Sequence, residues 1–202
     1  MNGCQANCSH PHHIGHFSAI SQMLEEYDIV IVFPYPKKYV DGKQEMLPPI
    51  SQRMKMLELF CIDFFPKVID RICLINLAAE MSMGTNNIAH TYDYLTHIKN
   101  KLPKKSTLRV CLGFDSQYFL QKEKFYNEDL IKKEFSPFYL QEENKIKSED
   151  LRHFFVMHKN IRSKKEENYI RYAVGNSLSE HIFKNNLYGV NKIKNKPCII
   201  KK

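Results

Sequence analysis

Short hydrophobic runs that alternate with helix-like segments constrain the fold of this 202-residue chain more than any other feature. Residues 28–33 form a nearly continuous β-branched run, as expected of a parallel strand that is buried on both faces. Two prolines, Pro34 and Pro36, end this run. Residues 51–64 then carry apolar side chains at helical spacing. This alternation predicts a Rossmann-like α/β fold, with a mostly parallel sheet flanked by helices.

The alternation of strand-like and helix-like segments continues along the chain. We also expect a small helical part at the C-terminal end. We expect further strands at residues 71–77, 107–113, 154–158 and 168–174, and further helices at residues 88–98, 128–134 and 177–183. Residues 132–150 are polar and irregular, so the segment 131–150 is predicted to be an insertion or mobile loop, and 190–202 a basic tail. The length fits a single domain over residues 1–202.

Composition narrows the classes of function. No apolar run approaches the length of a membrane span, and the first residues lack the basic and apolar regions of a signal peptide, so we expect a cytoplasmic protein. The six cysteines are scattered and are interpreted as reduced thiols rather than a disulfide framework. The net charge of +8 lies mainly in the runs 99–105, 159–165 and 184–202. These runs are interpreted as solvated faces, and because no aromatic-interleaved basic motif of the RNA-binding kind occurs, we expect no nucleic acid partner.

The stretch His13-Ile14-Gly15-His16 carries the clearest chemical signal. Two histidines three residues apart at a helix start can point into one small volume, and the glycine lets the backbone come close to a ligand. Imidazoles donate hydrogen bonds without needing a permanent charge, which suits a polyphosphate. A zinc site is the alternative, because Cys4 and Cys8 lie nearby, but their spacing matches no common closed site and we expect no resident metal.

Three predicted strands end in loops that would meet at one edge of the sheet. These are the His-rich loop, the turn that holds Lys37 and Lys38, and Gly113 with Asp115. Because ligands of open α/β sheets bind outside the carboxyl ends of the strands, the convergence of the three loops predicts a binding site there.

On these motifs the chain resembles the HxGH nucleotidyltransferase superfamily, and within it the nicotinate/nicotinamide mononucleotide adenylyltransferases. The matching segments follow the family's order: residues 8–16, 32–38, 53–59, 84–91, 113–115 and 177–179. The resemblance implies an enzyme that joins ATP to a pyridine mononucleotide, releasing pyrophosphate and forming a dinucleotide. It also implies Mg²⁺ bound with the ATP, and a homo-oligomer is one possible assembly.

The resemblance also implies roles for individual residues. His13 and His16 would be catalytic and stabilise charge on the ATP phosphates. The ATP-binding residues would be Ser9, Gly15, Gly113, Asp115, Ser177 and Ser179. The mononucleotide-binding residues would be Lys37, Lys38, Arg53, Thr85 and Asn86.

Other interpretations of these residues remain open at the level of sequence. Ser177 also fits a helix N-cap, with Glu180 completing a capping box, and Arg53 fits a surface ion pair. The HxGH string is shared with class I aminoacyl-tRNA synthetases, although the chain is short and the nearest candidate for their second loop lacks its lysines. The remaining alternatives are a nucleotidyltransferase with another phosphate acceptor and a non-catalytic nucleotide- or RNA-binding protein.

Overall fold

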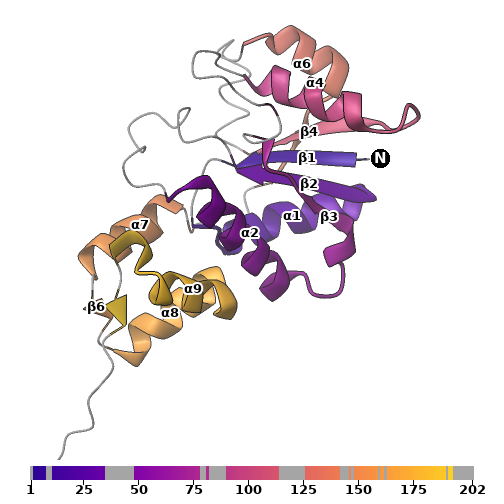
Figure 1. Ribbon diagram of the computed structural model, residues 1–202. Coiled ribbons are helices and arrows are strands. Elements are labelled where there is room, and N and C mark those ends of the chain that lie inside the picture. Colours follow the sequence, from indigo (N-terminus) through magenta and orange to yellow (C-terminus); the bar gives the residue numbers. More distant parts are fainter. Residues whose placement is uncertain are drawn as a thin grey trace, which may run out of the picture.

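The computed structural model describes residues 2–7, 11–34, 48–77, 81, 90–113, 126–141, 146, 148–158, 160–161, 163–189 and 191–192. Its centre is a parallel five-stranded sheet of order β3-β2-β1-β4-β5, shown in Figure 1. The strands are β1 (Asn2–Asn7), β2 (Ile29–Pro34), β3 (Ile72–Leu74), β4 (Leu108–Leu112) and β5 (Phe138–Tyr139). The predicted fold class, a mostly parallel sheet flanked by helices, is confirmed.

Alternate residues of the strands build two cores, one on each face of the sheet. Val30 and Val32 of β2 belong to one core, with α1 (Ile14–Glu26) and α2 (Ile50–Phe64). Ile31 and Phe33 belong to the other, with α4 (Thr91–Lys101) and α6 (Glu128–Phe135). Because side chains of a strand point to opposite faces in turn, the uninterrupted apolar run of β2 serves both cores.

The C-terminal part is helical and packs on α2. It comprises α7 (Ser148–Met157), α8 (Lys164–Val174), α9 (Asn176–Lys184), the short helix η4 (Leu187–Gly189), and the small parallel pair β6 (Asn160–Ile161) and β7 (Asn191–Lys192). Helix α9 lies between α2 and α8, and the buried residues of all these helices join the core that α1 and α2 form. Figure 1 shows this part at one end of the sheet.

Two segments predicted as strands, residues 154–158 and 168–174, are helical, and those predictions are wrong. The first lies mostly in α7 and the second in α8. A capping box at Ser163 and Glu166 starts α8, and Ile170, Ala173 and Val174 then follow at helical spacing. These apolar residues are β-branched or small, so their short run alone resembled a strand.

The segment 132–150 is also more regular than predicted. Residues 132–135 complete α6, Phe138–Tyr139 forms the edge strand β5, and α7 begins at Ser148. Its residues 142–145 and 147 lie outside the described part. The short helix η3 (Ile69–Arg71) precedes β3, where the prediction placed the strand one residue early.

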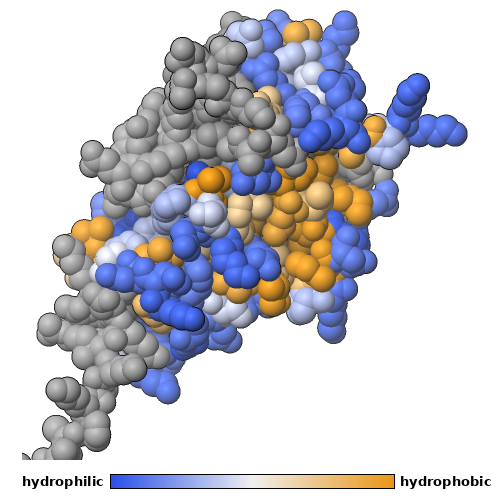
Figure 2. Space-filling view, viewed as in Figure 1, coloured by the Kyte–Doolittle hydropathy of each residue, from blue (hydrophilic) through white to orange (hydrophobic). Residues whose placement is uncertain are grey.

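One side of the molecule carries hydrophobic surface over β3 and the adjoining part of α2 (Figure 2). Ile62 of α2 is 46% exposed and Ile69 of η3 is 39% exposed. Within the ranges that the structure describes, no helix combines the length and the apolar character needed to cross a membrane.

Candidate active site

The site lies where the direction of the strand order changes. From the central β1 the chain passes to β2 and β3 on one side, and it later returns to β4 and β5 on the other. Both β2 and β4 therefore flank β1. After β1 the chain continues toward β2, and after β4 it continues toward β5, so the two connections run in opposite directions from the carboxyl ends of β1 and β4. Ligands of open α/β sheets bind at this topological switch point. Helix α1, which follows β1, begins there at Ile14, directly after His13.

His13 and His16 cap the helix that follows β1. The Nδ1 atom of His13 accepts a hydrogen bond from the backbone N–H of Gly15 at 3.1 Å. The Nδ1 atom of His16 accepts one from the backbone N–H of His13 at 3.2 Å. The two rings lie with their centroids 4.0 Å apart. Together they form a reciprocal capping box in which imidazoles replace the usual hydroxyl and carboxylate.

These hydrogen bonds assign the tautomer of both rings. A ring nitrogen that accepts a hydrogen bond carries no hydrogen, so each neutral imidazole holds its hydrogen on Nε2. Burial, and then the nearby Arg152 guanidinium, lower the pKa of His13 from 6.5 to about 3. Burial and the proximity of His13 lower the pKa of His16 well below its ordinary value. Two neutral Nε2–H donors therefore stand at the start of α1.

Gly15 is required by the ring of His13. A Cβ atom on Gly15 would lie 2.8 Å from Cε1 and 3.0 Å from Nδ1 of that ring, and 3.1 Å from the carbonyl oxygen of Ile146. Contacts this short force a neighbour to move. The glycine of the motif thus lets the ring of His13 lie against the first turn of the helix. The structure brings His13, Gly15 and His16 together as predicted, while their roles in catalysis and ATP binding stay predictions.

The start of helix α7 contacts the His-containing loop, residues 11–13, which the sequence did not predict. The Ser148 hydroxyl at the start of α7 donates to the carbonyl oxygen of Pro11 at 3.1 Å. Arg152, one turn further on, is 5% exposed and acts electrostatically on His13. A helix-start signal was present in the sequence, because Ser148, Glu149 and Asp150 precede apolar residues at helical spacing. This signal was not used, because residues 154–158 of the same segment were predicted to form a strand.

Arg53 is buried rather than placed in a surface ion pair. Its side chain is 1% exposed, and its Nε donates to the carbonyl oxygen of Pro48 at 3.1 Å. Gly113 follows the carboxyl end of β4, and a Cβ atom there would meet no atom of the described residues within 4 Å. The remaining predicted site residues lie outside the described part of the chain: Ser9, Lys37, Lys38, Thr85, Asn86 and Asp115.

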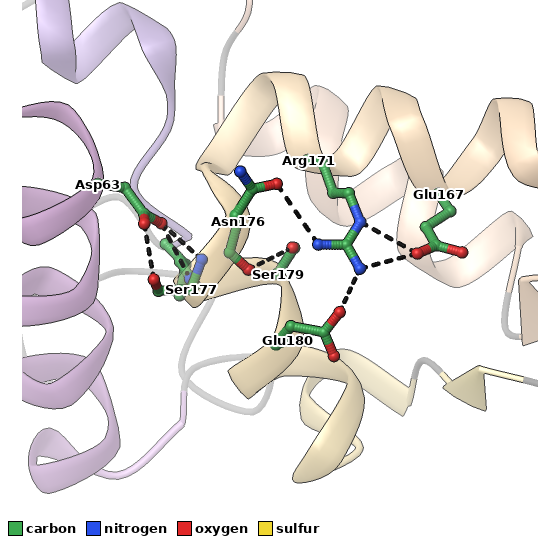
Figure 3. Close-up of polar contacts among 8 residues, drawn as sticks. Asp63, Glu167, Arg171, Asn176, Ser177, Ser179 and Glu180 are labelled. Carbon is green, nitrogen blue, oxygen red and sulfur yellow. Dashed lines mark hydrogen bonds and ion pairs between the residues drawn. The ribbon is translucent and has the colours of Figure 1, made fainter.

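Ser177 and Ser179 both make hydrogen bonds within the helical part. The Ser177 hydroxyl donates to Oδ1 of Asp63 at 2.7 Å, and its backbone N–H donates to Oδ2 at 2.7 Å. Ser179 is completely buried, and its hydroxyl donates to the carbonyl oxygen of Asn176. Figure 3 shows Asp63 of α2 reaching the first turn of α9. Ser177 thus serves the contact between α2 and α9, whereas Ser179 makes its hydrogen bond within α9. The predicted role of both serines in ATP binding is untested.

The alternative interpretation of Ser177 as a helix N-cap is wrong. Helix α9 starts one residue earlier, and its N-cap is Gly175, whose φ of +91° favours glycine. The carboxylate of Asp63 satisfies the N–H groups that a capping side chain would have bound. Glu180 pairs instead with Arg171 of α8 (Figure 3). Sequence reasoning missed Asp63, because its partners lie more than a hundred residues away.

No group of three or more metal-ligating side chains occurs among the residues that the structure describes. Cys8 and His10 lie outside that part, and only the backbone of the strand that holds Cys4 is described. The donors near the start of α1 are imidazole N–H and guanidinium groups, which can bind an anion, whereas Mg²⁺ prefers oxygen ligands.

Comparison with known protein families identifies the class of protein to which this chain belongs. A family model described as cytidylyltransferase-like matches residues 10–154. The chain belongs to this family, and it is a nucleotidyltransferase. The matched segment includes the His-containing loop and ends within α7. A search of curated proteins finds no match.

Solved structures share the fold. A putative nicotinate-nucleotide adenylyltransferase from Vibrio parahaemolyticus superimposes with a TM-score of 0.67 at 20% identity, covering 89% of this chain and 96% of its own. The Plasmodium falciparum nicotinic acid mononucleotide adenylyltransferase, solved with NaAD, gives 0.62 at 17% identity, covering 94% and 98%. A bifunctional NMN adenylyltransferase/ADP-ribose pyrophosphatase from Francisella tularensis, solved with AMP and a manganese ion, gives 0.57 at 14% identity, covering 93% and 50%.

Proposed function

We propose that this nucleotidyltransferase is an adenylyltransferase that joins ATP to nicotinate or nicotinamide mononucleotide. The products are a pyridine dinucleotide and pyrophosphate. One observation carries the proposal: His13 and His16 are both neutral and both hold their hydrogen on Nε2, at the helix that follows the central strand. This arrangement supplies hydrogen-bond donors and the positive end of a helix dipole to a polyphosphate.

The reaction requires positioning and charge stabilisation more than covalent chemistry from the protein. A phosphate oxygen of the mononucleotide attacks the α-phosphorus of ATP and forms a new P–O bond. The bond between the α-phosphorus and the α/β bridging oxygen breaks, and its electron pair leaves with pyrophosphate. The Nε2–H groups of His13 and His16 donate to the oxygens on which this charge develops. Both rings are neutral at physiological pH, so the histidines hold this position without titrating.

Other residues would orient the substrates. Gly15 leaves room for the ring of His13 at the start of α1, where the helix dipole favours an anion. Arg53 and the predicted Lys37 and Lys38 would bind the mononucleotide. Mg²⁺ would be held by phosphate oxygens and water, because the residues described beside the histidines offer no carboxylate cluster. When bound, the ion would neutralise part of the phosphate charge.

Pyrophosphate release from Mg-ATP tests the proposal directly. Release should depend on added nicotinate or nicotinamide mononucleotide, and it should fall by about 100-fold or more in His16→Ala, the effect expected from losing a charge-stabilising donor. His153→Ala is the matched control, because His153 lies on the outer side of α7 with a side chain 76% exposed. It should retain the wild-type rate.

The two mononucleotides compared side by side also decide the preference between them. Release that needs neither mononucleotide would contradict the proposal. ATP binding without turnover would support a non-catalytic nucleotide-binding protein. Turnover that appears only with another phosphorylated acceptor would keep the class of reaction and replace the substrate.

A further inference from the structure

A buried arginine outside the HxGH motif stands beside the first histidine. Arg152 belongs to α7 and is 5% exposed. Ser148, four residues earlier, fixes this helix to the loop by donating to Pro11. Side chains four residues apart share one face of a helix, so Arg152 stands on the face that meets the His-containing loop. The carbonyl of Ile146 lies close to Gly15 in the first turn of α1, directly after that loop.

The charge of Arg152 acts on the site. After burial, its guanidinium is the main cause of the lowered pKa of His13. It also opposes the rise that burial produces in the pKa of Tyr188, and Arg53 of α2 has the same effect on that tyrosine. Tyr188 is fixed by stacking on Phe155, which is also in α7. Cationic groups from α2 and α7 therefore lie within electrostatic range of one tyrosine, and one of them lies beside the histidines.

We propose that Arg152 is a phosphate-binding residue of the site and donates to the pyrophosphate portion of the nucleotide alongside Nε2 of His13. The proposal deepens the proposed function, on which the identity of the ligand rests. Neutral histidines donate hydrogen bonds but bring no charge to a polyanion, whereas a guanidinium brings both charge and a planar pair of donors.

Binding measurements on the intact protein test this role without requiring turnover. Calorimetric titration of inorganic pyrophosphate should show affinity roughly 10- to 100-fold weaker in Arg152→Met, the loss expected for a charge-assisted hydrogen bond. Arg152→Lys keeps the charge without the planar fork and should lie between the two. Adenosine, which has no phosphate, should bind all variants alike. Arg171→Met is the matched control, since Arg171 pairs with Glu167 and Glu180 on α8 and α9, and it should bind pyrophosphate as the wild type does.

Unchanged pyrophosphate affinity in Arg152→Met would overturn the proposal, as would an equal loss for adenosine. If the methionine variant does not fold, crystals of the wild type with pyrophosphate decide. A phosphate oxygen within about 3.2 Å of the guanidinium supports the role, and a phosphate bound elsewhere overturns it. Failure of the adenylyltransferase proposal gives a different result: pyrophosphate affinity would still depend on Arg152, with no release that depends on a mononucleotide.

Discussion

The backbone N–H of His13 donates to Nδ1 of His16 at 3.2 Å, so one imidazole both caps α1 and presents its opposite nitrogen as a donor. The two nitrogens of the ring therefore have separate tasks. Nδ1 belongs to the fold, because it satisfies an amide that the helix leaves without a partner. Nε2 belongs to the proposed chemistry, because it is the nitrogen that carries the hydrogen.

This division predicts opposite outcomes for two amide substitutions at His16. Asparagine places its amide oxygen near the position of Nδ1, so His16→Asn should keep the stability of α1 but lose about 100-fold in turnover. Glutamine extends its amide to the position of Nε2, so His16→Gln should retain more activity than the asparagine variant. Steady-state rates and thermal midpoints measured on both proteins check this. Equal activity in the two would show that Nε2 plays no special part.

The lowered pKa of His13 predicts that stability falls in mild acid. The folded pKa is about 3 and the ordinary value is 6.5, so between these pH values the unfolded chain binds more protons than the folded protein. Stability is therefore complete above pH 6.5 and decreases as the pH falls toward 3. The limiting slope for one such group is about 1.4 kcal/mol per pH unit. The free energy of unfolding, measured with urea at pH 5, 6 and 7, should depend less on pH in His13→Asn than in the wild type. Asparagine is a good N-cap residue and has no titrating ring.

Gly15→Ala should be more harmful than an ordinary glycine-to-alanine change within a helix. Alanine usually stabilises a helix by roughly 1 kcal/mol relative to glycine. Here the added methyl group would lie 2.8 Å from the ring of His13 and must displace it. We expect no gain in stability and a fall in turnover of about 10-fold or more, since misplacing a reacting group by about 1 Å has effects of this size. In Gly113→Ala the added methyl group meets none of the residues that the structure describes, so its unfolding free energy should change little.

The sequence predicted the sheet better than the C-terminal helices, for a physical reason. The β2 segment is apolar on both faces, and a short run of this kind is typical of a parallel strand that is buried on both sides. Residues 168–174 bury one face only, and their identity as a helix depended on the capping box at Ser163 that precedes them. His13 and His16 could be found from spacing within four residues. Arg152 and Asp63 could not, because His13, on which Arg152 acts electrostatically, and Ser177, which Asp63 binds, lie more than a hundred residues away from them in the sequence.

A comparison of variants at Asp63 and Ser177 distinguishes the structural role of Ser177 from its predicted role in ATP binding. Its carboxylate accepts hydrogen bonds from the backbone N–H and hydroxyl of Ser177 and from the N–H of Leu178. Asp63→Ala should therefore destabilise the protein by about 1–2 kcal/mol, as the loss of a helix cap does. Ser177→Ala removes only the hydroxyl and should cost less. If the serine acts solely in packing, both variants should keep the wild-type KM for ATP when assayed below their unfolding temperature. A raised KM for ATP in Ser177→Ala, with the wild-type value retained in Asp63→Ala, would instead support the predicted contact between this hydroxyl and the nucleotide.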